Sequence, residues 1–474
     1  MISVISFFYL RIVMQHCFSF LRHSFVSRAF LIATMILVSC SSAFAQVNSG
    51  SPRVMTLEDC LRIAAGENLD VLSQRAQITF SEAQLGQANS GYLPTISVNA
   101  GWQRNLFLVE TPIVVQGVQI GSQRPADNLF NSSLRINYNV FDGFNREGTI
   151  DQAKAGLEST NKNAQFILQR TLNNVRAQYL TVMRAQQVLN VRRQDVEAGK
   201  QQLARVRAQF EAGTVPIAPV YTQEADNGNR EVLLVQAEND LEIAKNNLLT
   251  LLGMSAQQTI DFAPLNVPAS ISSSDMEQFR ASLGAIGQLS ASALTNRKDF
   301  LATRDAIAAA DGNLTVAKSG WYPSLNLFGG WFWSGTEFSN FDRAQKFLSL
   351  SLSIPVFDGF RRDNQIQAAQ AQILQRQYDS RIAELRITNE LQNALTQLTT
   401  SEKQLDVTTR AFRSAEQNFN AADERYKVGS ANYLDYVNAN FQLTNARINR
   451  ITALYNYVGS QYQVQFAMGT LDKR

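Results

Sequence analysis

Histidine and cysteine, on which many catalytic and metal sites depend, are scarce in this sequence. The 474 residues include 2 histidines and 3 cysteines. Both histidines and two of the cysteines lie in the first 45 residues, which read as a removable signal, so the rest of the chain keeps only Cys60. This excludes an intramolecular disulfide, a Ser-His or Cys-His pair and a histidine-rich metal site from the mature chain. We expect no catalytic residue, no cofactor, no metal site and no enzyme activity.

A concentration of charge of one sign is missing as well. Charged residues make up 18% of the sequence, the net charge is +3, and the two signs are interspersed along the chain. A nucleic-acid partner would need a concentrated basic face, so we expect no nucleic acid. With 9% aromatic residues, the composition is that of neither a disordered chain nor a charged tail.

An apolar run long enough for a spanning helix is also absent. The run Phe30–Val38 follows several arginines and precedes small residues at Ala43 and Ala45. This order is typical of a secretory signal, and we expect residues 1–45 to be cleaved off after Ala45. The positive part is long, so Met14 could be the true start. Alternatively, "LVSC" resembles a lipobox, with Cys40 as the lipidated residue.

Proline is absent from two long stretches, between Pro125 and Pro216 and again after Pro355. Both stretches carry apolar residues every seven positions, which indicates coiled-coil helices. The first series consists of Leu168, Val175, Val182, Leu189, Val196, Leu203 and Phe210, and the second of Leu391, Leu398, Leu405, Phe412, Phe419 and Tyr426. At ~1.5 Å per residue such a helix extends roughly 100 Å, which suits a rod or a tube.

One five-residue stretch, "VFDGF", occurs twice, at Val140–Phe144 and 216 residues later at Val356–Phe360. The same shift places Gly213 on Gly429, and a shift of 229 places "SGYLP" on "SGWYP". A duplication explains all of these matches. We therefore divide the chain into a first repeat (46–253), a connecting equatorial segment (254–284) and a second repeat (285–470). The longer loop between the strands belongs to the first repeat.

Between the helices the apolar period changes to two. Four segments alternate apolar with small or polar residues, at about 93–105, 129–141, 322–335 and 346–357. Their length and alternation are those of transmembrane β-strands, although a soluble sandwich would give the same pattern. Aromatic residues toward the strand ends favour the membrane. Four strands cannot close a barrel, and open edges are not tolerated in lipid, so we expect a cyclic homo-oligomer.

The repeated stretch has a local function at the junction between strand and helix. An aspartate at the start of the long helix would accept a backbone N–H of its first turn, and the next glycine would allow the change of direction. A proline marks the opposite junction, where a helix ends and a strand begins. The strand–helix joints are Asp142, Gly143, Asp358 and Gly359, and the helix–strand joints are Pro94 and Pro323.

The duplicated order of strands and helical hairpins, with the tips "RAQFEAGTVP" and "RYKVGSANYLDYVNA", resembles the TolC-like outer-membrane factor family over residues 54–470. The resemblance implies a mainly α protein with a transmembrane β-barrel. Each chain of the trimeric channel-tunnel would give four strands to a twelve-strand barrel and continue into the periplasm as a coiled-coil tunnel. It implies the outer membrane of a Gram-negative bacterium, outer-membrane lipid as surroundings, a periplasmic adaptor and an inner-membrane transporter of the RND or ABC type.

The two hairpin tips are candidate adaptor contacts through this resemblance. They consist of Gly213, Thr214, Val215, Gly429, Ser430 and Ala431. The simpler interpretation is that each glycine only provides a turn with positive φ. Both interpretations can hold together.

The resemblance also assigns three residues to the closed periplasmic end of the tunnel. Asp435, six residues after the second tip glycine, would form a ring that favours cations. Asn438 stands where known members carry a second acidic residue, which puts a second ring in doubt. Tyr426 corresponds to a tyrosine that helps to hold the aperture shut. The alternatives are a solvated carboxylate near a helix start for Asp435 and core packing for Tyr426.

The sequence thus predicts a passive exit duct for small molecules such as drugs or metals. The same duct could serve type I protein secretion. A trimeric surface stalk or adhesin is a more distant alternative, and so is a periplasmic adaptor, but neither explains two copies of strand pair and hairpin.

Overall fold

The structure, a computed structural model, describes residues 53–106, 111–123, 126–255, 260–265, 268, 271–337 and 344–471. It divides into two units, Met1–Arg53 and Val54–Arg474, of which the second holds the elements discussed below. The predicted signal, with Met14, Cys40 and Ala45, lies outside the described residues.

The helices occur in two matching sets. The first set consists of α2 (Leu57–Glu67), α3 (Leu69–Ser90), α4 (Asn145–Glu211) and α5 (Ala218–Leu251), and the second of α7 (Ile286–Asn296), α8 (Lys298–Ser319), α9 (Arg361–Lys427) and α10 (Tyr433–Ala467). The bounds of α2 and α3 recur in α7 and α8 after 229 residues, and those of α4 recur in α9 after 216. We call residues related by these two shifts equivalent.

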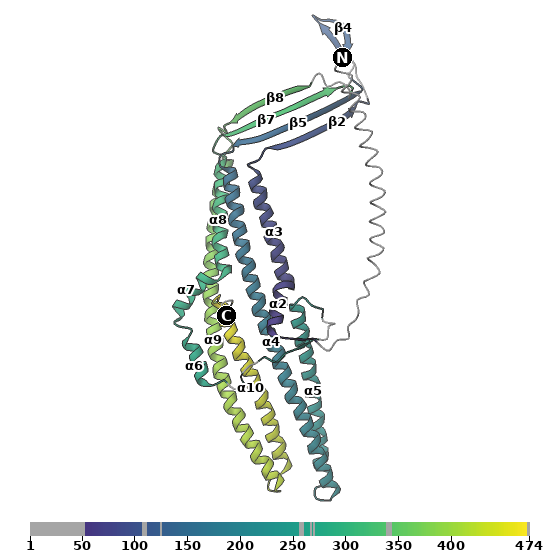
Figure 1. Ribbon diagram of the computed structural model, residues 1–474, viewed down its shortest axis with the longest axis vertical. Coiled ribbons are helices and arrows are strands. Elements are labelled where there is room, and N and C mark those ends of the chain that lie inside the picture. Colours follow the sequence, from purple (N-terminus) through teal and green to yellow (C-terminus); the bar gives the residue numbers. More distant parts are fainter. Residues whose placement is uncertain are drawn as a thin grey trace, which may run out of the picture. The chain divides into compact units, whose positions relative to one another are not determined.

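The four predicted strands form one antiparallel sheet. Its members are β2 (Thr95–Arg104), β5 (Asn128–Phe141), β7 (Ser324–Gly335) and β8 (Gln345–Ser353), in the order β2-β5-β7-β8 (Figure 1). Thr95 lies opposite Asn137, and Ser324 lies opposite Ser353. Strand β8 ends four residues before the predicted end, close to Pro355, which has no N–H to donate to a ladder. The two edge strands β2 and β8 are exposed along their whole length.

The longer loop of the first repeat contains a small hairpin that the sequence did not reveal. Strands β3 (Thr111–Val115) and β4 (Val118–Gln123) pair with each other across Gln116 and Gly117. Both turn residues have positive φ, which is the backbone of a two-residue hairpin turn.

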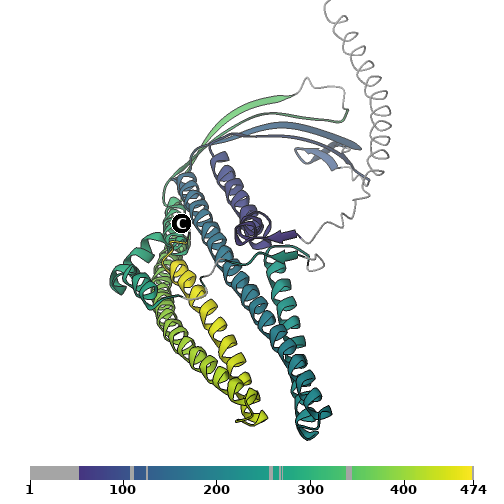
Figure 2. The same ribbon diagram turned by 60° about the horizontal axis from the view of Figure 1, so that its bottom comes forward.

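Four helices lie side by side in the order α3, α4, α8, α9 (Figure 1). Helices α4 and α8 meet almost backbone to backbone, because a Cβ on Gly312 would lie 2.6 Å from the backbone nitrogen of Gln152. Helices α5 and α10 fold back on α4 and α9, which makes hairpin 1 (α4–α5) and hairpin 2 (α9–α10). Figure 2 shows both hairpins from another direction.

The apolar core follows the predicted seam of the long helices. Val175, Val182, Leu189 and Val196 are buried, whereas Phe210 near the tip is 40% exposed. Cys60 on α2 is buried in the same core, and burial raises the pKa of its thiol to about 12. A buried free cysteine of this kind packs as a small apolar residue.

The equatorial segment adds β6 (Ile260–Phe262) and α6 (Ser273–Ala281). Strand β6 pairs with β1 (Arg53–Met55). The hydroxyl of Tyr179 on α4 donates to the carbonyl of Ala263, just after β6, at 2.5 Å. These contacts fasten the segment to the middle of hairpin 1.

Candidate functional site

The first hairpin tip is a tight turn that ends α4. Gly213 has φ +72°, and no atom lies within 4 Å of where its Cβ would be, so glycine is required there for its backbone and not for space. The backbone N–H and hydroxyl of Thr214 both donate to the carbonyl of Gln209, at 2.9 and 2.8 Å. Gly213 and Thr214 are exposed and Val215 is half-buried.

The second tip repeats this geometry at the end of α9. Gly429 has φ +75° and no neighbour at its Cβ position. The backbone N–H groups of Ser430 and Ala431 both donate to the carbonyl of Arg425. Gly429 and Ser430 are exposed, and Ala431 is half-buried. Each tip is therefore a self-contained cap whose exposed side chains are small and uncharged.

Tyr426, three residues before the second tip glycine, belongs to an aromatic cluster. Its ring stacks on Tyr436 of α10 with 5.3 Å between centroids, and Tyr433 lies 5.9 Å away. Burial raises the pKa of all three phenols. The core-packing interpretation thus has direct support in this chain. The gate role of Tyr426 stays a prediction.

A polar residue of hairpin 1 that sequence reasoning missed lies beside this cluster. Gln202 on α4 is 3% exposed. Its side chain lies beside the Tyr426 hydroxyl and lowers the pKa of that phenol, against the larger effect of burial. The only available signal was a glutamine next to the apolar seam position Leu203, which does not reveal a contact with another helix.

Asp435 and Asn438 lie one turn apart near the start of α10, and both are exposed. The backbone N–H of Asp435 donates to the side chain of Asn432, the N-cap residue, at 2.8 Å. A carboxylate in a first turn is favoured by the helix dipole. The single chain therefore accounts for Asp435 without an aperture, and its ring role stays a prediction.

The strand–helix joints differ from the prediction in one detail. The N-cap residues are Phe144 and Phe360, both with positive φ, and not Asp142 and Asp358. Each aspartate lies two residues before the cap and still accepts a hydrogen bond from a backbone N–H of the first turn. Asp142 accepts from Arg146 at 3.1 Å, and Asp358 accepts from Arg362 at 3.2 Å. Two consecutive residues in the left-handed region, Gly143–Phe144 and Gly359–Phe360, make the turn, so the helix begins later than a plain aspartate cap would place it.

Each joint is tied together by one buried arginine that the sequence analysis overlooked. Arg362 donates to the carbonyls of Gly320 and Pro355, at 3.2 and 3.1 Å, and its guanidinium lies 4.3 Å from the ring centroid of Trp321. The equivalent Arg146 repeats this arrangement with the carbonyls of Gly91 and Asn139 and the ring of Tyr92. The duplicated "VFDGF" followed two residues later by arginine in both copies was the available signal.

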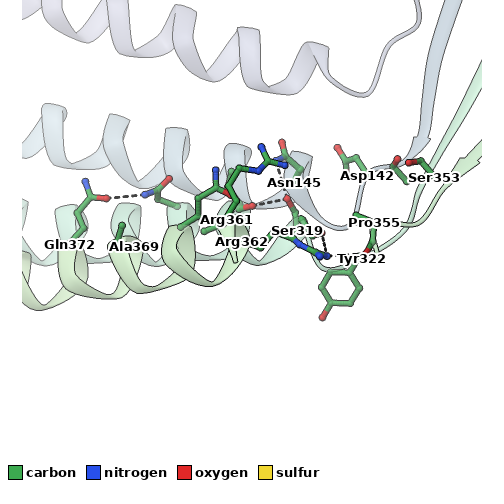
Figure 3. A pocket seen from close by; sticks show the side chains of 17 residues that line it. Asp142, Asn145, Ser319, Tyr322, Ser353, Pro355, Arg361, Arg362, Ala369 and Gln372 are labelled. Carbon is green, nitrogen blue, oxygen red and sulfur yellow. Dashed lines mark hydrogen bonds between the residues drawn. The ribbon is translucent and has the colours of Figure 1, made fainter. Parts of the chain in front are cut away.

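The helix–strand joints complete this junction. Pro94 stands directly before β2, and Pro323 stands directly before β7. A cleft of about 650 Å³ lies at the second junction, lined by side chains of α8, α9 and the start of α4 (Figure 3).

In the described ranges, no group of three or more histidine, cysteine, aspartate and glutamate side chains is placed to hold a metal ion. No helix of the described part combines the length and the apolar character needed to cross a membrane.

Comparison with known proteins points to one family. A family model described as outer membrane efflux protein matches residues 60–254 and 289–470. The chain is 22% identical over 421 residues to the outer membrane efflux protein BepC of Brucella suis, which covers 88% of this chain and 86% of BepC. It is 24% identical over 362 residues to the outer membrane protein TolC of Escherichia coli, covering 73% and 71%. The crystal structure of VceC from Vibrio cholerae superposes with a TM-score of 0.71 at 15% identity, over 87% of this chain and 96% of VceC.

Proposed function

Because the chain belongs to the outer membrane efflux protein family, we propose that three copies of it close one passive outer-membrane channel through which small molecules leave the periplasm. One observation carries this proposal. The first strand–helix joint packs against the end of α8, whereas the equivalent second joint is exposed in the single chain.

The first strand–helix joint is docked on the end of α8. Asn145 donates to Ser319 Oγ at 3.1 Å (Figure 3), and the ring of Phe144 meets Tyr322 edge to face at 5.4 Å. A Cβ on Gly143 would lie 2.5 Å from the carbonyl oxygen of Ser319. The first repeat thus fits tightly against the second.

The second joint has the same shape but no such neighbour in the described chain. Phe360 is 65% exposed, and no atom lies within 4 Å of where a Cβ on Gly359 would be. The surface equivalent to the end of α8 is the end of α3, where Leu93 is 67% exposed. Docking Phe360 of one copy on Leu93 of the next would repeat the internal contact.

The exposed face of α5 and the two edge strands of the sheet also lack the neighbour that their equivalents have within the chain. Ile451 of α10 packs against the core of hairpin 1, whereas the equivalent Val235 of α5 is 64% exposed. A neighbouring α9 would cover Val235 as α4 covers Ile451. The edge strands β2 and β8 run antiparallel to each other, so β8 of one copy can pair with β2 of the next. Such pairing would remove edges that lipid does not tolerate.

The channel would work without chemistry of its own, and the driving force would come from a pump in the inner membrane. We assign the contact with a periplasmic adaptor to the tips around Gly213 and Gly429, which present small uncharged surfaces. The narrow periplasmic end would be lined by Asp435, with Tyr426 behind it and Asn438 adding polarity without charge.

The family description as efflux proteins favours small molecules as cargo over type I protein secretion. A deletion strain separates the two. Loss of resistance to toxic small molecules supports efflux, and loss of a secreted protein with resistance unchanged supports secretion.

The trimer is tested by thiol cross-linking in outer-membrane vesicles. In a background without other cysteines, Ser90→Cys with Arg361→Cys should cross-link between chains to a trimer, because this pair is equivalent to Ser319 and Asn145. The matched control, Asn145→Cys with Ser319→Cys, should cross-link within one chain. Monomer only from the first pair, with the control cross-linked, would refute the proposed interface. The purified trimer should then give discrete currents in a planar bilayer.

A further inference from the structure

The two faces of the sheet β2-β5-β7-β8 differ in polarity. Side chains alternate between the faces along each strand, and residues opposite each other on neighbouring strands share a face. One face carries Val98, Leu134 and Trp331, which lie opposite one another in turn. The other carries mainly serine and asparagine, at Ser97, Asn99, Asn137, Asn326, Ser349 and Ser351. In a transmembrane barrel the apolar face meets lipid, so we call the polar face the lumen face.

Arg135 is the one charged residue that the described strands β2, β5, β7 and β8 place on the lumen face. It is exposed, and it lies opposite Ser97 on β2 and Gly330 on β7. Neither neighbour has a side chain large enough to cover a guanidinium. Arginine is not deprotonated in proteins. Arg135 therefore places a permanent positive charge on the wall of the lumen.

Three phenylalanines interrupt the polarity of the lumen face around Arg135. Phe328 and Phe332 stand two residues before and after Gly330 on β7. Each is thus a diagonal neighbour of Arg135, at a spacing that aromatic and long side chains bridge. The ring of Phe347 on β8 lies over Gly330, because a Cβ on this glycine would be 3.2 Å from Phe347 Cζ. All three phenylalanines are at least 36% exposed. We call Arg135, Phe328, Phe332 and Phe347 the Arg135 collar.

The pairing of the strands does not require these four residues, as the other copy of each strand demonstrates. The equivalent positions all carry uncharged polar residues. They are Ser351 for Arg135, Asn131 for Phe347, Asn99 for Phe328 and Gln103 for Phe332. The charge and the three exposed rings therefore need a reason other than the sheet. Exposed apolar side chains gathered on a polar surface mark an interaction site.

The charge of the collar would act across the whole opening of the barrel. Twelve strands about 4.8 Å apart and tilted by about 45° give a barrel roughly 25 Å wide between backbones. In about 0.1 M salt the screening length is about 10 Å. The centre of the lumen is then little more than one screening length from the wall, and three copies of Arg135 surround it.

We propose that the Arg135 collar is a selectivity site of the barrel for organic anions that carry an aromatic or apolar part. The guanidinium attracts the anionic group, and the phenylalanine rings take up the apolar part, so a solute needs both features to be held. Arginine also stacks on aromatic rings, which adds to this preference. The inference rests on the proposed channel function and names one class of its cargo.

The first test is the block of ion current in planar bilayers by 1-naphthalenesulfonate, an aromatic anion added to both sides. Every channel carries Asp435→Asn, so that the charge proposed for the periplasmic end does not repel the probe. We expect Arg135→Gln, and equally Arg135→Ser, to weaken the block about tenfold, which corresponds to about 1.4 kcal/mol. Arg104→Gln is the matched control, because Arg104 lies on the apolar face, and it should leave the block unchanged.

The salt dependence separates an electrostatic role of Arg135 from a structural one. In about 1 M salt the screening length falls to about 3 Å, so the difference between Arg135→Gln and its parent should disappear. Arg135→Lys keeps the charge and should retain most of the block in about 0.1 M salt. A difference that persists in high salt would overturn the inference.

The second test removes rings and keeps the charge. Phe332→Gln with Phe347→Asn gives the collar the residues of the other copy, so the strands should still pair and heat-stable trimer should form. We expect the block by 1-naphthalenesulfonate to weaken about tenfold, and methanesulfonate, an anion without a ring, to block none of the channels.

Three results would overturn the inference in variants that form trimers. They are a block that Arg135→Gln leaves in place, a block as strong by methanesulfonate, and a block as strong by 1-naphthylmethylammonium, which has the same ring and the opposite charge. A wild-type trimer without any current would instead count against the proposed channel.

Discussion

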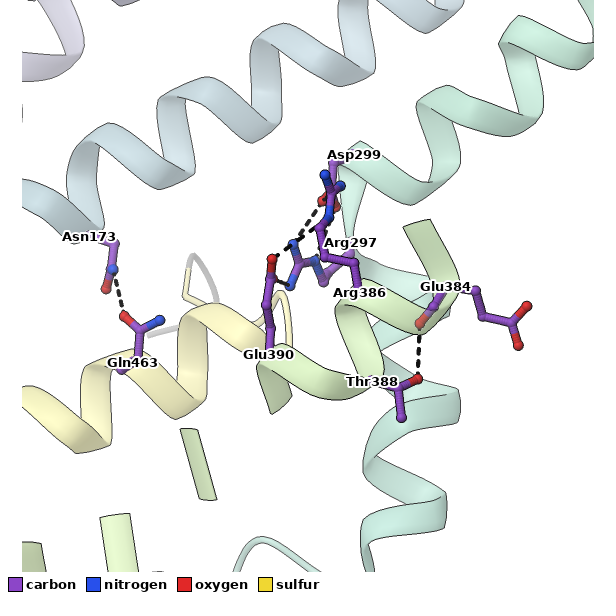
Figure 4. Close-up of polar contacts among 8 residues, drawn as sticks. All are labelled: Asn173, Arg297, Asp299, Glu384, Arg386, Thr388, Glu390 and Gln463. Atoms are coloured by element: carbon purple, nitrogen blue, oxygen red, sulfur yellow. Dashed lines mark hydrogen bonds and ion pairs between the residues drawn. The ribbon is translucent and has the colours of Figure 1, made fainter. Parts of the chain in front are cut away.

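Arg297, the N-cap residue of α8, allows a prediction of stability at the point where the two repeats meet. It is buried, and its Nε and Nη2 donate to the two carboxylate oxygens of Asp299 at 3.1 and 2.7 Å (Figure 4). Its Nη1 donates to Glu390 of α9 at 2.5 Å. The rings of Phe166 and Phe466 lie 5.6 and 5.9 Å from the guanidinium.

Removing one member of a buried ion pair costs roughly 3–5 kcal/mol, because a charge is left unpaired. In Arg297→Met, Asp299 keeps a weaker partner in Arg386, whose Nη2 lies 3.4 Å away. We therefore expect a loss near the lower limit, about 3 kcal/mol in the free energy of unfolding.

The equivalent position in the first repeat provides the matched comparison. Asn68 caps α3 and donates to the carbonyl of Leu251 at 2.8 Å, so it joins α3 to the end of α5 without a charge. Asn68→Ala should cost about 1–2 kcal/mol, from one cap and one hydrogen bond.

The assay is urea unfolding of the detergent-solubilised protein, followed by far-UV circular dichroism. Both variants should lower the urea midpoint with an unchanged slope, and Arg297→Met should lower it further than Asn68→Ala does. Arg413→Ala, an exposed arginine of α9, should leave the midpoint in place. A shift for Arg297→Met no larger than that for Asn68→Ala would refute the argument that the buried ion pair dominates this junction.

Two further predictions concern the periplasmic end. Asp435→Asn should lower the cation selectivity of the channel, measured as the reversal potential in a salt gradient, because a ring of carboxylates would be neutralised; an unchanged potential would remove Asp435 from the aperture. Burial raises the pKa of Tyr426, Tyr433 and Tyr436, so the stability that their protonated forms contribute is present below about pH 10 and is lost as the pH rises through the raised values. Absorbance at 295 nm should therefore show late phenolate formation that coincides with a loss of helical signal, and Tyr433→Phe should reduce that loss.

The repetition of this fold could be derived from the sequence, because it rests on local signals. Proline gaps, the seven-residue seam and the shifts of 216 and 229 residues predicted the long helices and their correspondence. The alternation of period two predicted the strands. Each of these signals depends on residues that are neighbours in the sequence, or on matches between two copies.

The contacts between helices could not be derived in this way. Thr444 and Asp195 are 249 residues apart, and neither sits in a motif that marks a buried pair. The N-cap at Phe144 was missed for a different reason. A phenylalanine in the left-handed region goes against its local preference, and it is held there by the packing of its ring on Phe141 and Tyr322.

The positions at which the two repeats differ say more about function than the positions at which they agree. Where both copies need the same junction, they use the same residue, as with Arg146 and Arg362. Where one copy buries a charge and the other does not, the shared fold cannot be the reason for the charge. Arg297 against Asn68 is such a pair at the equator, and there the apolar rings around the guanidinium fix it in place. Arg230 against Ala446 is the other, and there Asn440 and Thr444 of α10 hydrogen-bond Arg230 and its partner Asp195. The same fold therefore fixes a buried charge in two ways, with aromatic rings at the equator and with amide and hydroxyl partners nearer the tips.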